Sequence, residues 1–207
     1  IITDNVFLRM ILPIFPLNGA VLFPGTNLPL NIFEDRYVDM IDFALSKDRK
    51  IGMIQSNESN QIYSVGCVGK INSFNETSDG RYLISLQGLT CFEVQEEIET
   101  KKKFRSVKVK LVQNSLEENY NFSDDERHDI VDKYKSYIKI KNLNLDLAEI
   151  ENIELSQLIK FIAMVSPFKN IEKQALLETF DIKDFYSKLL SLIELEIASE
   201  SPNKTIN

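Results

Sequence analysis

The apolar positions of this chain follow two periodicities, and the change between them falls near residue 115. Before this point apolar and polar residues mostly alternate, as they do in half-buried strands, and all seven glycines lie there. After it, apolar residues recur at helical spacing, and Pro167 is the only proline before the C-terminal tail. Strands followed by helices predict an α+β protein, with a β-rich domain over residues 1–115 and a helical bundle over 116–200. The polar residues 201–207 are expected to form a disordered tail.

The β-rich part contains several segments with the period-two pattern of strands. Residues 105–112 alternate most clearly, with valine and leucine on one face and serine and lysine on the other. The pair Asp79-Gly80 between two apolar runs predicts a turn, because glycine adopts positive φ without steric strain, so we expect a hairpin over 65–87. In its second strand, Tyr82, Ile84 and Leu86 alternate with Leu83, Ser85 and Gln87. Other extended segments are expected at 12–17, 28–33, 50–55 and 92–94.

Helical patterns complete the assignment. Within the β-rich part, Tyr37, Ile41 and Leu45 share one helical face, which predicts a helix over about residues 34–47. Ser123 followed by Glu126 has the spacing of a capping box and predicts the start of the first bundle helix. Three further helices are expected at 155–165, 171–179 and 183–199, the first of them ending at Ser166-Pro167.

The charge of the chain limits its partners. With 24 Lys+Arg against 31 Asp+Glu the formal net charge is −7, and the pI is near 4.9. A protein held by the phosphates of nucleic acid needs a clustered basic face, which this sequence does not indicate. No run of about 18 apolar residues predicts a membrane span, and the chain does not open with a signal-peptide pattern. We therefore expect a cytoplasmic protein that binds neither nucleic acid nor membrane.

The residue types that carry most catalytic chemistry are few. Gly69-Lys70, the one Gly-Lys pair, lacks the first glycine and the following Ser or Thr of a phosphate-binding loop. The single histidine, His128, lies in the acidic first turns of a predicted helix, and Cys67 and Cys91 fall in predicted strands as small apolar residues. Adjacent carboxylates are typical of solvated loops, since acid–base catalysis needs carboxylates that face each other across a cleft. The sequence therefore predicts no catalytic, cofactor-binding or metal-binding residues, and a protein that is not an enzyme.

One ordered set of segments is more specific. It comprises LPIFPL at 12–17, VLFPG at 21–25, LPLNIFEDRY at 28–37, IGMI at 51–54, VGCVGKI at 65–71, DGRYLI at 79–84, LQG at 86–88 and EKQALLE at 172–178. In order and spacing this set resembles the N-terminal domain of Lon proteases over about residues 10–198. Cys91 departs from the family pattern, which commonly has an arginine directly before the phenylalanine of this strand.

The resemblance implies a fold and a function. Lon N-terminal domains consist of a β-rich, PUA-like pseudo-barrel followed by a helical bundle, in agreement with the patterns above. In Lon they help to recognise unfolded or damaged proteins and assist assembly with other Lon subunits, while ATPase and Ser-Lys peptidase modules follow them. Neither module has a counterpart in these 207 residues. We expect a stand-alone bacterial relative of that domain, with a fragment of the protease as the alternative. It is expected to bind unfolded or damaged polypeptides or to act as an adaptor. Its expected partners are unfolded or damaged protein segments, a protease or other Lon subunits.

The candidate partner-binding residues lie within or near the resembling segments: Phe33, Arg36, Tyr37, Phe74 and Arg81. Aromatic side chains would bind apolar segments of a client by burial, and a client strand would pair with an exposed sheet edge. For Arg36 the alternative is structural, a bond with Glu34 or Asp35 that fixes the helix start to the barrel. Two other functions stay open: RNA binding through the PUA-like barrel, and a small-ligand or hydrolase pocket between barrel and bundle.

Overall fold

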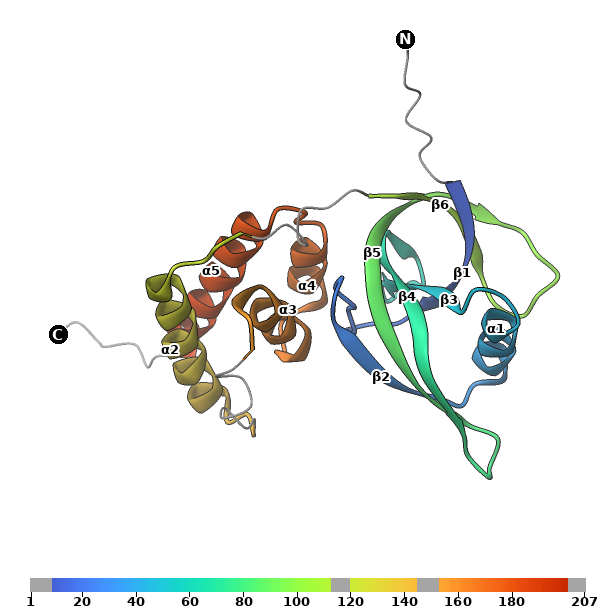
Figure 1. The fold of residues 1–207 in the computed structure, drawn as a ribbon, viewed down its shortest axis with the longest axis horizontal. Coiled ribbons are helices and arrows are strands. Elements are labelled where there is room, and N and C mark those ends of the chain that lie inside the picture. The colour runs from blue at the N-terminus through green and yellow to red at the C-terminus, as the bar shows by residue number, and fades with distance from the viewer. Residues whose placement is uncertain (1–8, 113–119, 145–152, 201–207) are drawn as a thin grey trace, which may run out of the picture.

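The computed structural model of the chain describes residues 9–112, 120–144 and 153–200. A six-stranded sheet forms one end of the molecule, and a group of helices forms the other (Figure 1). One helix, α1 (Asp35–Leu45), lies apart from this group and against the sheet. The predicted α+β fold, with strands first and helices second, is confirmed.

The sheet curls until its two ends meet. Its strands are β1 (Arg9–Pro16), β2 (Asn27–Ile32), β3 (Lys50–Ser56), β4 (Ile62–Glu76), β5 (Tyr82–Ile98) and β6 (Ser106–Leu111). They are ordered β2-β5-β4-β3-β1-β6, and an additional pairing of β5 with β6 closes the sheet into a barrel. β1 and β3 run parallel, whereas β5 is antiparallel to each of its three neighbours. Five of the strands share an apolar cluster that includes Leu12, Phe92 and Val109.

β4 and β5 form a hairpin that extends well beyond the rest of the barrel (Figure 1). The two strands span 15 and 17 residues. Gly80 in their turn has φ 79°, a conformation that favours glycine, as the Asp79-Gly80 pair predicts. The expected hairpin is therefore present, and both of its strands are longer than the sequence pattern indicated.

One sequence prediction about β5 is wrong. Separate strand segments were expected at 82–87 and 92–94, whereas β5 runs unbroken from Tyr82 to Ile98. The reason lies at Gly88, where a Cβ atom would lie 2.1 Å from the carbonyl oxygen of Phe23. The absence of a side chain lets the Phe23 backbone approach the strand closely. The interruption of the apolar pattern thus marks a close contact and not a strand end.

The bundle contains four helices among the described residues: α2 (Asp124–Lys141), α3 (Leu155–Val165), α4 (Asn170–Leu177) and α5 (Ile182–Glu200). The capping box is confirmed, because Ser123 Oγ accepts a hydrogen bond from the Glu126 N–H at 3.2 Å. α2 and α5 run side by side in the same direction. Tyr186 near the start of α5 donates to the Glu126 carbonyl oxygen at 2.9 Å, and Lys141 at the end of α2 pairs with Glu200 at 2.9 Å.

α4 joins the bundle to the barrel through buried polar groups. Gln174 is 1% exposed, and its Nε2 donates to the Val65 carbonyl oxygen of β4 at 3.1 Å. Its Oε1 accepts from Gln55 Nε2 of β3 at 3.0 Å. The neighbouring Lys173 is also buried, and its Nζ donates to the Gly19 carbonyl oxygen at 3.3 Å. Because this lysine is withdrawn from water, its pKa is lowered.

The two parts of the chain also share apolar contacts. A single cluster of buried side chains extends from Met53 in β3 to Leu189 in α5. The predicted domain boundary at 115 and 116 lies outside the described residues, and so does the predicted tail 201–207. The division of the chain into two domains therefore stays a prediction.

Candidate functional site

Large apolar side chains are exposed at the free end of the β4–β5 hairpin. Phe33 is 64% exposed, Leu83 45% and Phe74 42%. They are three of the eight large hydrophobic residues that are exposed in the described parts of the chain. Single exposed apolar residues are common, so it is the presence of several at one end of the structure that makes them candidates for a contact site. We call these three residues the hairpin-end surface.

Strand pairing brings the three residues to the same end of the sheet. Ile32, the last residue of β2, lies opposite Tyr82, the first residue of β5, so Phe33 follows directly at the hairpin end. Phe74 in β4 lies opposite the residue that follows Leu83 in β5. Because side chains alternate along a strand, Phe74 and Leu83 project from opposite faces of the hairpin. The hairpin end therefore presents apolar groups on both faces.

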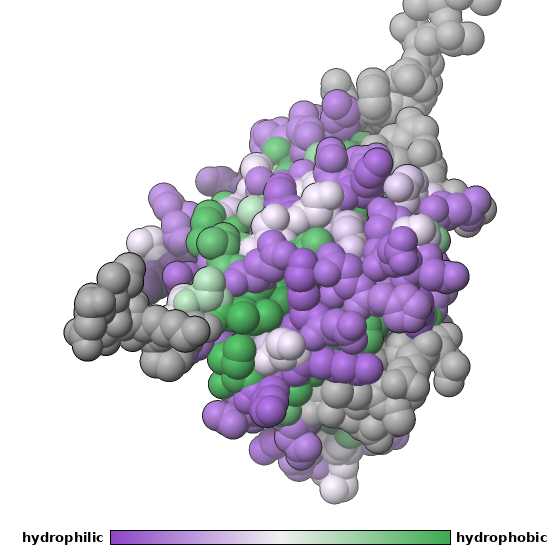
Figure 2. All heavy atoms as spheres, turned by 90° about the vertical axis from the view of Figure 1, so that its left-hand side faces the viewer, coloured by the Kyte–Doolittle hydropathy of each residue, from purple (hydrophilic) through white to green (hydrophobic). Residues whose placement is uncertain are grey.

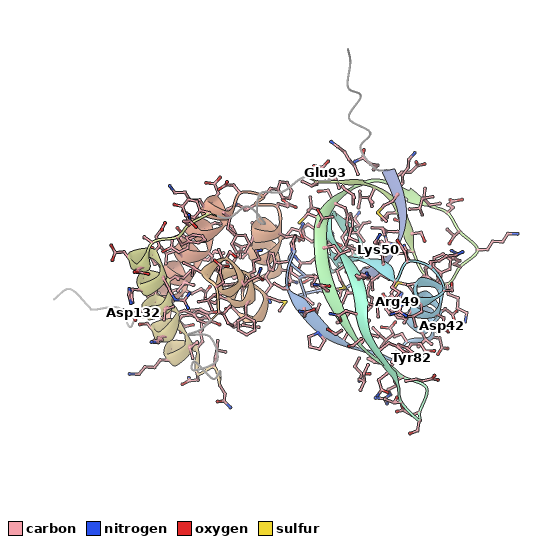
Figure 3. All side chains as sticks on the ribbon, viewed as in Figure 1. Asp42, Arg49, Lys50, Tyr82, Glu93 and Asp132 are labelled. Atoms are coloured by element: carbon pink, nitrogen blue, oxygen red, sulfur yellow. The ribbon has the colours of Figure 1, made fainter. Side chains whose placement is uncertain are left out.

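α1 braces this end of the hairpin. Tyr82 Oη donates a hydrogen bond to Asp42 Oδ1 at 2.8 Å, and Figure 3 shows the two side chains on the side of the hairpin that faces α1. The bond to Asp42 raises the pKa of Tyr82 to about 12, since it favours the protonated phenol. The same ring packs edge-on against Phe74, with centroids 4.9 Å apart. Phe74 is thus held by a ring that is itself fixed to a helix.

Two of the predicted site residues support α1. Arg36 forms an ion pair with Glu34 at 2.8 Å, and its guanidinium lies 4.5 Å from the centre of the Tyr37 ring. The bond expected to fix the helix start to the barrel is therefore local, between residues two positions apart. Tyr37 makes the contact with the barrel instead, because its ring packs edge-on against Phe15 of β1 at 4.3 Å. Tyr37 is only 7% exposed, so we leave it out of the hairpin-end surface. The same burial raises its pKa.

Arg81 shapes the hairpin turn. Its Nε pairs with Asp79 Oδ2 at 3.0 Å, and Thr77 Oγ1 donates to the Asp79 carboxylate. The Thr77 hydrogen bond, with a smaller contribution from the Arg81 charge, lowers the pKa of Asp79. The Thr77 N–H also donates to the Arg81 carbonyl oxygen at 2.9 Å. Arg81 is exposed, so its charge flanks the hairpin-end surface as well as stabilising the turn.

Leu83 was not among the residues expected to bind a partner. Its signal was nevertheless present in the sequence, because the alternation of β5 places Leu83 on the same face as Ser85 and Gln87. A large apolar residue on an otherwise polar strand face has no core to enter. That pattern, and not resemblance to a family, predicts that Leu83 is exposed, as it is.

The residues with reactive side chains lie in different parts of the molecule. Cys67 and Cys91 are cross-strand neighbours in β4 and β5, each 0% exposed, and burial raises the pKa of the Cys67 thiol. His128 is exposed on α2, beside a hollow of about 250 Å³ that Arg127 and Lys135 also line. In the described ranges, no group of three or more His, Cys, Asp or Glu residues is placed to hold a metal ion.

The opposite, helical end of the molecule is mostly hydrophilic, with hydrophobic areas between charged side chains (Figure 2). The exposed large apolar residues of its helices are Ile140, Val165, Ile171 and Leu195, spread over four helices. Ion pairs that join α2 to α5, such as Lys133 with Glu194, add to its polar character. None of the helices in the described part of the chain combines the length and apolar composition needed to cross a membrane.

The sequence is similar to one family of known proteins. Residues 11–194 match the family described as ATP-dependent protease La (LON) substrate-binding domain. The chain is 28% identical over 210 residues to the Lon protease of Dictyoglomus thermophilum, a similarity that covers 95% of this chain and 26% of that protein. It is 29% identical over 208 residues to the Lon protease of Flavobacterium johnsoniae, with 94% and 25% covered. The chain thus spans about a quarter of the length of these relatives.

Two solved structures have the same fold. A Lon N-terminal domain protein from Xanthomonas campestris superposes with a TM-score of 0.66 at 19% identity, over 88% of this chain and 98% of that one. The N-terminal domain of the Mycobacterium avium complex Lon protease gives a TM-score of 0.64 at 16% identity, over 89% and 98%. At these identities the likeness confirms the fold expected from the sequence.

Proposed function

Since this chain belongs to the family of Lon protease substrate-binding domains, we propose that it recognises substrate polypeptides through the hairpin-end surface. The proposed ligands are unfolded or damaged protein segments with exposed apolar side chains. A folded protein buries such side chains, so a surface that binds them distinguishes non-native chains from native ones. The observation that carries this proposal is the exposure of Phe33, Phe74 and Leu83 at one end of a braced hairpin.

The strength of binding follows from the area that remains to be buried. Complete burial of a Phe or Leu side chain is worth roughly 1.5–3 kcal/mol. The three residues are 42–64% exposed, so each offers about half of that value, or about 1 kcal/mol. After the costs of association, such a surface supports weak and rapidly exchanging contacts. Weak apolar contacts accept many different apolar sequences, as the recognition of unfolded chains requires.

The bracing of the hairpin adds to this affinity. Phe74 is packed on Tyr82, and Tyr82 is bonded to Asp42 of α1. A side chain that is already held in place loses less conformational freedom when a ligand covers it. Phe74 is therefore suited to act as a preformed apolar contact. In this role the domain captures the client polypeptide, and catalytic modules elsewhere act on it.

The proposal is tested by titrating a fluorescently labelled, reduced and carboxymethylated protein, which stays unfolded, against the chain. We expect the double variant Phe33→Ser with Phe74→Ser to bind it about tenfold or more weakly, because about 2 kcal/mol of apolar contact is removed. The control is Ile171→Ser on α4, where the residue removed is 61% exposed but lies outside the hairpin end. Equal weakening by both variants would contradict the proposed site. Equal affinity for the folded form of the same client would contradict the proposed function.

A further inference from the structure

One edge of the hairpin has no neighbouring strand. β3 pairs with β4 only as far as Lys70, so beyond it β4 has β5 on one side and no described strand on the other. Residues 72–76 are all exposed. The edge lies on the side of the hairpin that faces α1 (Figure 1). An unpaired strand edge presents free N–H and C=O groups, on which another strand can assemble.

Pro29 in β2 indicates which backbone groups this edge offers. Proline has no N–H and occupies strand positions that do not donate to the neighbouring strand. Its cross-strand partner Ser85 therefore directs its own N–H and C=O away from β2 and toward β4. The Gly88 N–H, three residues further along β5, points the other way and donates to the Thr26 carbonyl oxygen at 2.9 Å. This direction agrees with the alternation expected along a strand.

The same alternation continues into β4. Ser85 lies opposite Ser73, so Ser73 and, two residues later, Asn75 exchange their backbone hydrogen bonds with β5. The N–H and C=O groups of Phe74 and Glu76 consequently point away from β5, along the open edge. Their spacing of two residues matches the repeat of an extended polypeptide.

The other open edge of the hairpin sheet is protected. On the outer side of β2, Pro29 removes one donor from the middle of the strand. Residues 72–76 of β4 contain neither proline nor lysine, the residues that most often block strand addition. The two edges therefore differ in their capacity to accept a strand, and the edge of β4 is the available one.

Unneutralised positive charge lies at the base of this edge. The Ile71 N–H donates to the Arg49 carbonyl oxygen at 2.9 Å, which places Arg49 beside the start of the open segment. Lys70 lies opposite Lys50, a pairing of like charges that is unfavourable in itself. Lys50 is paired with Asp48 at 3.1 Å, but the side chains of Arg49 and Lys70 make no ion pair with any described residue. Figure 3 places Arg49 and Lys50 near β4 on its α1 side.

We propose that an extended segment of a client polypeptide adds to β4 at residues 72–76 as a further strand, with an acidic side chain near Arg49 and Lys70. This inference rests on the proposed function and specifies how the client is held. Backbone pairing with Phe74 and Glu76 gives affinity that does not depend on the client sequence. The two cations select segments with an acidic residue at one end and fix the direction in which the segment binds.

The first experiment uses peptides and the unaltered chain. The probe is a fluorescein-labelled eight-residue peptide of alternating Val and Thr that ends in two Glu residues. One control is the same peptide with N-methyl groups on alternate residues, because these groups block pairing along one edge of the peptide. The other control is the same peptide ending in two Lys residues. We expect each control to bind about tenfold more weakly than the probe, since hydrogen bonds or charge attraction are lost. Raising the salt concentration should weaken only the acidic probe.

The second experiment uses a matched pair of variants at Glu76. Glu76→Pro removes an outward N–H but no hydrogen bond between β4 and β5, whereas Glu76→Ala keeps the N–H and removes the carboxylate. We expect the proline variant to bind the probe about tenfold more weakly and the alanine variant to bind it at least as well as the original chain. Arg49→Asn with Lys70→Gln should abolish the preference for the acidic over the lysine peptide. Asparagine suits position 49, where φ is 61°.

The outcomes separate this inference from the proposed function. If the N-methylated peptide binds as well as the probe while Phe33→Ser with Phe74→Ser still weakens the unfolded client, strand addition is wrong and the hairpin-end surface stands. If neither the peptides nor the unfolded client binds, both proposals fail. If the probe instead competes with self-association of the chain, seen as a concentration-dependent mass in light scattering, the edge pairs with a second copy and the client proposal is overturned. Equal binding of inorganic polyphosphate and probe would also overturn it, since the site would then recognise charge alone.

Discussion

Gln174 provides a direct test of how α4 couples the helical bundle to the barrel. Its side chain makes hydrogen bonds to Gln55 at 3.0 Å, to the Val65 carbonyl oxygen at 3.1 Å and to Glu178 at 2.8 Å. Gln174→Met keeps the length and approximate volume of the side chain but cannot form these bonds. The substitution therefore isolates the contribution of the hydrogen bonds from that of packing.

The expected magnitude follows from the two bonds that are buried. A buried hydrogen bond contributes about 0.5–1.5 kcal/mol, and a partner left without one adds its desolvation penalty. Gln55 Nε2 retains a second bond, to the Asn170 carbonyl oxygen at 3.1 Å, which limits the loss at that end. We therefore expect Gln174→Met to lower the free energy of unfolding by about 2 kcal/mol, equivalent to about 4–8 °C in melting temperature for a chain of this size.

The assay is equilibrium unfolding in urea, followed by circular dichroism and by tyrosine fluorescence, because the chain has seven Tyr and no Trp. The matched control is Gln157→Met on α3. Gln157 also contacts the barrel, since its Nε2 would lie 3.1 Å from a Cβ on Gly25, but its side chain makes no hydrogen bond with the described residues. We expect the control to change stability by less than about 0.5 kcal/mol. Losses of equal size at the two positions would refute the role of the buried amides.

Two further predictions concern the hairpin. Gly88→Ala should lower the free energy of unfolding in urea by about 3 kcal/mol, because the new Cβ meets the Phe23 backbone. Gly80→Ala, in open space at φ 79°, should lower it by only about 1 kcal/mol. Equal losses would contradict the close contact at Gly88. The pKa of Tyr82 is raised from 10.0 to about 12 in the folded chain. Its hydrogen bond should therefore stabilise the fold fully below pH 10, and this stabilisation should be lost as the pH rises to 12. Tyr82→Phe should therefore show a shallower decline of unfolding free energy over that range, and an unchanged decline would exclude the bond to Asp42.

The candidate site illustrates where sequence patterns stop being informative. Phe33, Tyr37 and Phe74 looked alike as aromatic residues within or near the resembling segments, yet Tyr37 is 7% exposed and the other two 64% and 42%. Tyr37 is covered because α1 turns it toward Phe15, a contact between residues 22 positions apart that no local pattern encodes. Leu83, by contrast, was visible in the alternation of its strand. Exposure of a single residue depends on which distant segment lies over it.

The open edge of β4 was equally inaccessible to sequence analysis. The run from 65 to 74 is strand-like along its whole length. Nothing in it distinguishes the residues that pair with β3, up to Lys70, from the later ones that do not. The difference arises because β3 begins at Lys50, opposite Lys70, so that beyond this point β4 pairs with β5 alone. Strand registers of this kind are set by long-range packing and by the position of the α1–β3 turn.

Features that depend on neighbouring residues could be predicted from the chain alone: strand and helix periods, the turn at Asp79-Gly80, the cap at Ser123, and the order of strands before helices. Each follows from backbone conformations and side-chain spacing within a few positions, where steric and hydrogen-bonding preferences act directly. Two features arise only when the whole chain folds, the pairing of β6 with β1 and the approach of Phe23 to Gly88. These involve segments distant in the chain, and their contacts are selected by how the whole core packs together.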